Sequence, residues 1–227
     1  MAGVSVLIPA YNEQDIIGQT VQAALGMPDI EEVVVIDDGS EDETPFVAYD
    51  AGARVIQMNQ NSGKGAAMNR GAAETNSEIL LIIDADLGPS AAETYKLLEP
   101  ILADQADMAI AVMKAPPGHK GGFGFVLKLA RWGIKKYGGI LVTAPISGQR
   151  AIRRRLIEDI GGFERGFGVE TALTIDALRK GYKIVEVPLP LNHRVSGRNL
   201  KGFVHRGQQF IDIVRALWKR KGTKSKF

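Results

Sequence analysis

The chain has 227 residues, of which 45% are hydrophobic and 24% are charged, a balance typical of a globular protein. This excludes disordered and collagen-like chains, and the absence of cysteine excludes disulfides, thiolate metal sites and a cysteine nucleophile. No apolar run reaches the roughly 20 residues of a membrane span, and no targeting segment precedes the first apolar run, so we expect a cytoplasmic protein. The length favours one large α/β domain over two small ones.

The net charge of +2 hides two halves of opposite sign. Residues 1–113 contain 4 Lys and Arg against 19 Asp and Glu, whereas residues 114–227 contain 24 against 7. An acidic half suits a bound cation, and a basic half suits phosphate or an anionic membrane surface. Charge alone favours the plainer interpretation, in which both signs belong to solvated faces.

The first half alternates apolar strand-like runs with segments of helical spacing. In chain order we expect a strand at 4–8, a helix through 16–25 with Asn12 at its N-cap, a strand at 32–36, a helix at 43–51, a strand at 54–58, a helix at 64–74, a strand at 79–83, a helix near 90–103 and a strand near 108–112. Strands without polar alternation indicate a mostly parallel sheet covered on both faces by helices.

The second half begins with a loop rich in Gly and Pro, predicted to be flexible over 114–124. An amphipathic helix follows at 123–137, with Phe125 and Trp132 among several lysines. A helix of this kind lies on a membrane surface or packs on the protein's own core, and the sequence favours neither. We expect helices near 149–158 and 170–179, a strand at 182–187, an amphipathic helix at 202–218 and a basic tail at 219–227.

Three polar clusters follow predicted strands, where an open parallel sheet binds its ligands. They are Pro9-Ala10-Tyr11-Asn12-Glu13, Asp37-Asp38-Gly39-Ser40 and Asp84-Ala85-Asp86. Each alone is as common in a simple turn, but three together predict a ligand crevice. The two carboxylates of the last cluster repel each other, and a divalent cation such as Mg²⁺ or Mn²⁺ relieves that repulsion.

Other polar groups could serve the same crevice. Lys64 lies between glycines at a predicted helix start, which suits a phosphate, although the spacing is not that of a P-loop. Glu170 either stabilises a helix start or projects into the crevice. His193 is either a surface residue or a metal ligand, and Arg194 and Arg198 nearby suit phosphate.

With these residues in place, the chain resembles the family-2 glycosyltransferases of the nucleotide-sugar GT-A fold. The resemblance runs from about Val4 to Ile213 through VSVLIPAYNE, VVVIDDGSEDET, NSGKGAAMNRGAAE, ILLIIDADL, ISGQRAIRR and GFGVETALTIDALRKGYKIVEVPL. It implies one GT-A domain over residues 1–218, with a nucleotide-sugar half (1–113) and an acceptor half (114–218). It also implies a metal-dependent transfer of a hexose from a nucleoside diphosphate sugar, such as UDP-glucose or GDP-mannose, to a phosphate-bearing acceptor.

The resemblance assigns roles to individual residues. The nucleotide-sugar contacts would be Pro9, Ala10, Tyr11, Glu13, Asp38, Gly39, Ser40, Gly63, Lys64, Asp84 and Ala85. The acceptor contacts would be Ser147, Gly148, Gln149, Arg194 and Arg198. Asp84, Asp86 and His193 would hold Mg²⁺ or Mn²⁺, and Asp86 and Glu170 would be the catalytic residues.

Two subgroups fit best, and each departs from this chain. Polyprenyl-phosphate sugar synthases, such as dolichyl-phosphate mannose synthase, share the GKG, DADL and SG-x-R-A strings, but often carry a Gln soon after the DxD and C-terminal membrane spans. Glucosyl-3-phosphoglycerate synthases share the G-[FY]-G-V-E string and a downstream His-Arg, but are usually longer. Inverting members place an Asp base after the glutamate, where this chain has Thr171. An ionised phosphate acceptor needs no such base, and neither does a retaining mechanism.

Other classes fit less well. A sugar nucleotidyltransferase needs a Gly-rich basic loop after the first strand, which Pro9-Ala10-Tyr11-Asn12-Glu13 does not provide. A non-catalytic nucleotide-sugar-binding protein remains an alternative, opposed by the intact DxD, GKG and GVE strings. Nucleic-acid binding is suggested only by the short basic tail, so we expect none. Peripheral contact with the inner face of a membrane stays a hypothesis for the helix at 123–137.

Overall fold

The computed structural model describes residues 3–113, 124–164, 166, 168–191 and 200–221. A seven-stranded sheet runs through its centre in the order β3-β2-β1-β4-β6-β5-β7. The strands are β1 (Val4–Ala10), β2 (Ile30–Asp37), β3 (Arg54–Gln57), β4 (Ile79–Ile82), β5 (Met108–Met113), β6 (Arg150–Arg153) and β7 (Ile184–Leu189). All neighbours pair in parallel except β6, which is antiparallel to β4 and β5. The predicted α/β class with a mostly parallel sheet is confirmed.

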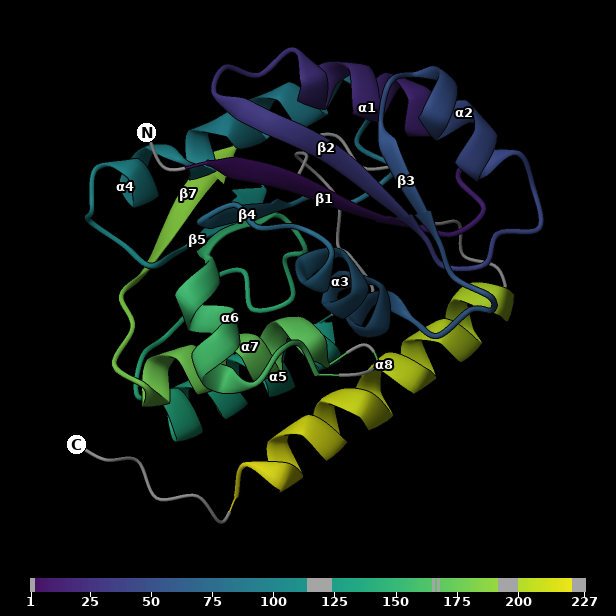
Figure 1. Cartoon of the computed structure of the whole chain (residues 1–227). Helices are drawn as coiled ribbons and strands as arrows, with labels where there is room; N and C mark the ends of the chain where they lie inside the picture. The colour runs from purple at the N-terminus through teal and green to yellow at the C-terminus, as the bar shows by residue number, and fades with distance from the viewer. Residues whose placement is uncertain (1–2, 114–123, 165, 167, 192–199, 222–227) are drawn as a thin grey trace.

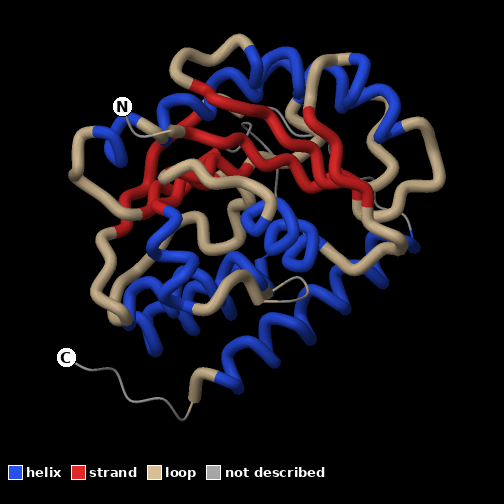
Figure 2. The backbone as a smooth tube through the Cα atoms, in the orientation of Figure 1, coloured by secondary structure: helices blue, strands red, loops and turns tan. Residues whose placement is uncertain are grey.

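Helices cover both faces of this sheet, as Figures 1 and 2 show. They are α1 (Ile17–Leu25), α2 (Thr44–Asp50), α3 (Lys64–Ala73), the 3₁₀ helix η1 (Gly88–Leu97), α4 (Glu99–Leu102), α5 (Gly124–Gly138), α6 (Arg154–Ile160), α7 (Val169–Arg179) and α8 (Leu200–Lys219). The helices α1, α2, η1 and α4 lie on one face, and α3, α5, α6, α7 and α8 lie on the other.

Each face has its own apolar core, because successive side chains of a strand point to opposite sides. In β1, Val6 and Ile8 join the cluster under α1, whereas Leu7 between them joins the cluster over α3 and α7. All three are fully buried. This two-sided burial explains why the strands are apolar throughout rather than alternating.

Three local predictions are wrong. Asn12 does not cap α1: its φ of 55° lies in the left-handed region, which Asn tolerates, and Ile16 takes the N-cap position. The expected helix at 90–103 is split into η1 and α4, separated by Leu98. The expected helix at 149–158 begins instead with β6, a central strand, and only then becomes α6. The pattern Arg150-Ala151-Ile152-Arg153 hid this strand because both of its arginines find partners inside the protein.

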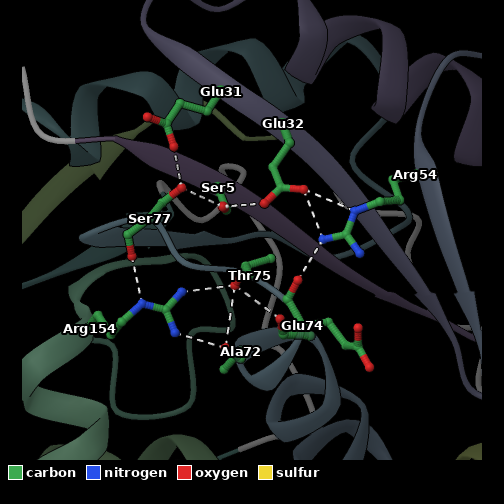
Figure 3. A network of polar contacts seen from close by, with 10 residues as sticks. Ser5, Glu31, Glu32, Arg54, Ala72, Glu74, Thr75, Ser77 and Arg154 are labelled. Atoms are coloured by element: carbon green, nitrogen blue, oxygen red, sulfur yellow. Dashed lines mark hydrogen bonds and ion pairs between the residues drawn. The ribbon is translucent and has the colours of Figure 1, made fainter.

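The edge of the sheet at the amino ends of β1, β2 and β4 is fixed by a polar network (Figure 3). Ser5 donates to Glu32 at 2.9 Å and lies 2.7 Å from the Ser77 hydroxyl, and Ser77 donates to Glu31. Arg54 donates to the Glu32 carboxylate and to the backbone carbonyl of Glu74. Arg154 of α6 donates to the carbonyls of Ser77 and Ala72 and to the Thr75 hydroxyl. A hollow of about 460 Å³ lies at this edge. The network ties α3 and α6 to the sheet at the edge opposite the carboxyl ends of β1, β2 and β4.

Candidate active site

The carboxyl ends of β1, β2 and β4 meet at one edge, because β2 and β4 flank β1 on opposite sides. This is a topological switch point, where open α/β sheets form their ligand crevice. The first two polar clusters are joined there. Asp38 donates its backbone N–H to the Ala10 carbonyl at 2.8 Å, and the Asn12 side-chain oxygen accepts from the backbone of Glu41 at 2.9 Å. The Glu13 N–H in turn donates to the Thr44 hydroxyl of α2 at 2.8 Å.

The Asp38 carboxylate organises the loop that leads to Lys64. It is 4% exposed and accepts the backbone N–H groups of Ser62 at 2.8 Å and of Gly63 at 2.7 Å. Gly39 beside it has a φ of 76°, and a β-carbon there would lie 2.8 Å from the carbonyl carbon of Gln60. The structure therefore gives Asp38 a positioning function that its place after a strand did not reveal.

Asp84 is the centre of the third cluster. Its two carboxylate oxygens accept from the Lys64 ammonium and from the Gln149 amide, each at 2.5 Å. The Lys64 ammonium also lies 3.3 Å from a Glu170 oxygen. Burial alone would lower the pKa of Lys64, but the charges of Asp84 and Glu170 and their hydrogen bonds outweigh it and raise that pKa. Lys64 therefore stays protonated between two carboxylates.

Four separate chain segments thus converge on one ion-pair cluster: Lys64 begins α3, Asp84 follows β4, Gln149 precedes β6, and Glu170 lies in the first turn of α7. We name these four residues the Asp84 cluster. Ser147 and Gly148 lie beside it, both buried, and a β-carbon on Gly148 would lie 2.6 Å from an Asp84 oxygen. The structure therefore brings the predicted acceptor contacts Ser147, Gly148 and Gln149 to the predicted metal ligand Asp84.

A buried arginine holds the segment that carries Gln149. Arg150 is 1% exposed and donates to the Ser147 carbonyl and to the Thr174 hydroxyl, both at 2.9 Å. Burial lowers the pKa of the Arg150 guanidinium to about 10, against the opposing charges of Glu170 and Glu186. Glu186 accepts the backbone N–H groups at the other end of this segment, from residues 143 and 144. The ISGQRAIRR string alone did not indicate that Arg150 and Glu186 hold this segment in place.

The other predicted contacts that the structure describes lie at or just after the ends of β1, β2 and β4. Pro9 and Ala10 end β1, Tyr11 is 41% exposed at the crevice edge, and Ser40 is hydrogen-bonded to the Asp37 carboxylate. Ala85 is buried in the turn between Asp84 and Asp86. His193, Arg194 and Arg198 lie outside the described residues, as do residues 114–123 of the predicted flexible loop.

The oxygen ligands available at this edge of the sheet fit a hard divalent cation. Asp84 and Asp86 present carboxylate oxygens two residues apart, and Mg²⁺ and Mn²⁺ prefer such ligands together with phosphate oxygens. Within the described part of the chain, however, no three His, Asp or Glu side chains come together as a metal site.

Thr20 of α1 positions the turn that carries both aspartates, a role that the predicted helix at 16–25 did not indicate. Its buried hydroxyl donates to the Ala85 carbonyl at 2.8 Å and accepts from the Gly88 N–H at 2.9 Å. A hydroxyl on a helix face that is otherwise apolar was the one available signal. Thr20 therefore ties α1 to the Asp84–Gly88 turn.

We expect Thr20→Val to lower the free energy of unfolding by about 1–3 kcal/mol, because it leaves the Ala85 carbonyl and the Gly88 N–H buried without this partner. Urea unfolding measures this change. Thr171→Val is the matched control: the Thr171 hydroxyl is buried and makes no hydrogen bond, so its removal should be neutral or stabilising. Equal losses in both variants would contradict the role given to Thr20.

Comparison with known proteins now identifies the family. The model of "Glycosyl transferase family 2" matches residues 5–161, which include β1 to β6 and the whole Asp38 and Asp84 arrangement except Glu170. The chain belongs to glycosyl transferase family 2. This confirms the resemblance drawn from the sequence motifs.

Three curated relatives illustrate the range of this family. A probable glycosyltransferase of Bacillus subtilis, YdaM, is 33% identical over 80% of the chain and 48% of its own length. The dolichol-phosphate mannosyltransferase of Pyrococcus furiosus is 30% identical over 88% of the chain and 59% of its own length. The glucosyl-3-phosphoglycerate synthase of Mycolicibacterium smegmatis is 33% identical over 76% of the chain and 63% of its own length. The chain thus spans between about half and two thirds of these three relatives.

Solved structures agree with the GT-A assignment. Glucosyl-3-phosphoglycerate synthase from Mycobacterium tuberculosis, in complex with phosphoglyceric acid, superposes with a TM-score of 0.83 and 28% identity, covering 99% of this chain and 82% of that one. Other crystals of that enzyme contain Mg²⁺ and UDP, or Mn²⁺, UDP and glucosyl-3-phosphoglycerate. This family 2 chain therefore shares the fold of that enzyme.

Proposed function

We propose that this family 2 chain is a metal-dependent hexosyltransferase that moves a hexose from a nucleoside diphosphate sugar to a phosphate-bearing acceptor. The acceptor is either a small phosphorylated acid or a polyprenyl phosphate. The relatives support both choices, since one is named for phosphoglycerate and another for dolichol phosphate. A cytoplasmic site of action stays a prediction.

The Asp84 cluster is the observation that carries this proposal. A carboxylate, an ammonium, an amide and a second carboxylate meet at the switch point of the sheet, beside Asp86. A crevice with this mixture suits a divalent cation together with a diphosphate, because carboxylate and phosphate oxygens are ligands that such a cation would prefer. Lys64 adds a positive charge that can turn from Asp84 toward a phosphate, and its pKa ensures that it stays protonated.

Each side of the crevice has a proposed task. Tyr11, Glu13 and the Asp38–Ser40 turn form the donor side, where Asp38 fixes the loop that ends at Lys64. Asp84 and Asp86 would hold Mg²⁺ or Mn²⁺, with His193 as a further proposed ligand. When bound, the cation would stabilise negative charge that develops on the leaving diphosphate. Ser147, Gly148 and Gln149 form the acceptor side, together with Arg194 and Arg198 as proposed phosphate contacts.

The position after Glu170 supports an acceptor that is already ionised. Thr171 carries a hydroxyl in place of a carboxylate and is 1% exposed, so it cannot act as a general base in the crevice. An alcohol acceptor must lose a proton during attack, whereas a phosphate oxygen is ionised near neutral pH and needs only to be positioned. The excess of Lys and Arg over Asp and Glu in residues 114–227 suits that positioning.

A partition assay tests the proposal. The purified chain, with Mn²⁺ or Mg²⁺, receives labelled UDP-glucose or GDP-mannose together with a polyprenyl phosphate or 3-phosphoglycerate. Label in the organic phase means a lipid-phosphate acceptor, and label in a new anionic aqueous product means a soluble one.

The matched control acceptors are polyprenol and glycerate, which lack the phosphate. We expect no transfer to either. Transfer to these alcohols at equal rates would contradict the phosphate-acceptor proposal. Binding of the donor without acceptor-dependent turnover, across both donors and both acceptors, would contradict the transferase proposal itself.

A further inference from the structure

Helix α5 exposes a stripe of aromatic and basic side chains. Phe125, Lys128, Trp132 and Lys135 follow one another at steps of three and four residues, so they share one face, and Lys136 borders it. Phe125 is 72% exposed and Trp132 is 50% exposed. The Lys136 ammonium lies 4.7 Å from the centre of the Trp132 ring. Large exposed aromatic side chains interleaved with lysines differ from an ordinary solvated helix face.

Helix α8 exposes an apolar stripe of its own. Ile211, Val214 and Trp218 are all exposed, again at steps of three and four residues, and Trp218 reaches 75%. The opposite side of the helix is buried at Ile213 and Ala216. The exposed stripe therefore takes no part in packing α8 against the rest of the described structure.

The two stripes adjoin each other where α5 and α8 are in contact. Both helices pack on α7 beneath them and on each other. Leu217 of α8 fills the space beside Gly133 of α5, and the rings of Phe125 and Phe210 lie 5.5 Å apart. Each stripe lies opposite the buried residues of its own helix, and the Phe125–Phe210 contact brings the two stripes together, so we treat them as one outward surface. We name it the α5/α8 surface, made of Phe125, Lys128, Trp132 and Lys135 with Ile211, Val214 and Trp218.

The charge of this surface has one sign. Helix α5 contains no Asp or Glu, and the one acidic residue of α8 is Asp212. Asp212 lies beside Gly166, away from the α5 contact, and pairs with Arg215 at 3.5 Å. The lysines of α5 are therefore not neutralised by an acid on their own helix.

We propose that the α5/α8 surface docks on an anionic lipid bilayer, parallel to the membrane plane. Tryptophan and phenylalanine partition into the interface between headgroups and acyl chains, and lysines among them attract anionic headgroups. No helix in the described part of the chain is long and apolar enough to cross a bilayer, so the contact is peripheral. The inference stands on this surface alone and does not depend on the proposed transferase activity.

The surface begins near the candidate active site. Helices α5, α7 and α8 run in the same direction, since Tyr137 near the end of α5 and Arg220 just after α8 both bind Arg179 at the end of α7. Glu170 of the Asp84 cluster lies in the first turn of α7. Phe125 begins α5, at the corresponding end of the helical layer. Docking would therefore bring the acceptor side of the crevice close to the lipid headgroups.

A second copy of the chain is a poorer occupant. A twofold dimer whose axis passes close to α5 would set the lysines of one α5 near those of the other, and juxtaposed like charges are unfavourable. An anionic bilayer offers an apolar region for the aromatic rings and negatively charged headgroups for the lysines. This is why we favour lipid over self-association.

Intrinsic fluorescence gives a direct test, because Trp132 and Trp218 are the two tryptophans of the chain and both lie on this surface. The whole chain is titrated with vesicles of phosphatidylcholine, with or without phosphatidylglycerol, at low and at high salt. We expect a blue shift of the emission and co-flotation with the anionic vesicles, weakened by salt. Neither effect should occur with neutral vesicles. Brominated lipids should quench the emission.

Substitutions test whether vesicle binding depends on the α5/α8 surface rather than on another part of the molecule. We expect Phe125→Ser with Trp218→Ser to weaken partitioning by about tenfold or more, and Lys128→Glu with Lys135→Glu by about a hundredfold. The matched control is Phe46→Ser with Tyr49→Ser on α2, which removes two equally exposed aromatic rings from the other face of the sheet. It should partition like the unaltered chain.

Three results would overturn the proposal. They are no partitioning onto anionic vesicles, equal losses in the control and the surface variants, and a blue shift that grows with protein concentration without lipid. The last result would show that a second copy covers the surface. Activity on a soluble acceptor is unaffected by any of these outcomes, so failure here is distinguishable from failure of the proposed function.

Discussion

Asp86→Asn is expected to reduce metal-dependent sugar transfer by at least about a thousandfold while the chain stays folded. The substitution keeps the size of the side chain and removes one of the two carboxylates that follow β4. A cation at a leaving diphosphate contributes several kcal/mol to transition-state stabilisation, and about 1.4 kcal/mol corresponds to a tenfold change in rate. Initial rates with saturating Mn²⁺ measure the effect.

A binding readout separates lost chemistry from lost folding. For the unaltered chain we expect Mn²⁺ together with a nucleoside diphosphate to raise the melting temperature, because a ligand that binds only the folded state stabilises it. Without ligand, Asp86→Asn should melt at the same temperature as the unaltered chain. Mn²⁺ together with a nucleoside diphosphate should not raise the melting temperature of this variant. The control is Glu93→Gln, which alters a half-buried acid of η1 that pairs with Lys96. Near-normal turnover in folded Asp86→Asn would contradict the metal assignment.

Gly148→Ala is expected to lower kcat/KM by about a hundredfold with little change in stability. The added methyl group would lie 2.6 and 2.7 Å from the two Asp84 oxygens, and it would also meet the Lys64 ammonium. These atoms are the ends of side chains, so they can move aside without unfolding the chain. Their movement breaks the Asp84 cluster, and misplacement of about 1 Å in an active site can cost a hundredfold in rate.

Gly124→Ala is the matched control for this substitution. A β-carbon at Gly124 meets nothing within 4 Å, so the same added methyl group should leave both activity and melting temperature unchanged. Steady-state kinetics and thermal unfolding of the two variants are compared side by side. Full activity in Gly148→Ala would show that the close packing of this segment against Asp84 is not required.

Much of the fold followed from local pattern. The apolar runs of β1, β2 and β4 are buried on both faces, and such strands are recognisable because nothing polar interrupts them. Their order in a mostly parallel sheet then placed Asp38 and Asp84 at one edge. Helical spacing of apolar residues also located α5 and α8, but it did not say which of their residues would be exposed.

Other features depended on contacts between distant segments. The strand β6 looked helical because its stability comes from pairing with β4 and β5 and from internal partners for Arg150 and Arg153. Asn12 looked like a helix cap, yet its side chain binds the backbone of Glu41 across the crevice. No local window contains these partners, so no local pattern could predict them.

The sequence alone therefore established the strand ends, the acidic pair after β4 and the glycines around Lys64, because these depend on residue type and short spacing. Only the tertiary structure joined Lys64, Asp84, Gln149 and Glu170 into one cluster and gave Asp38 and Thr20 their backbone partners. The physical reason is that a charged or hydroxyl group acquires its role from the donors and acceptors that surround it, and topology brings those groups together from positions up to about a hundred residues apart.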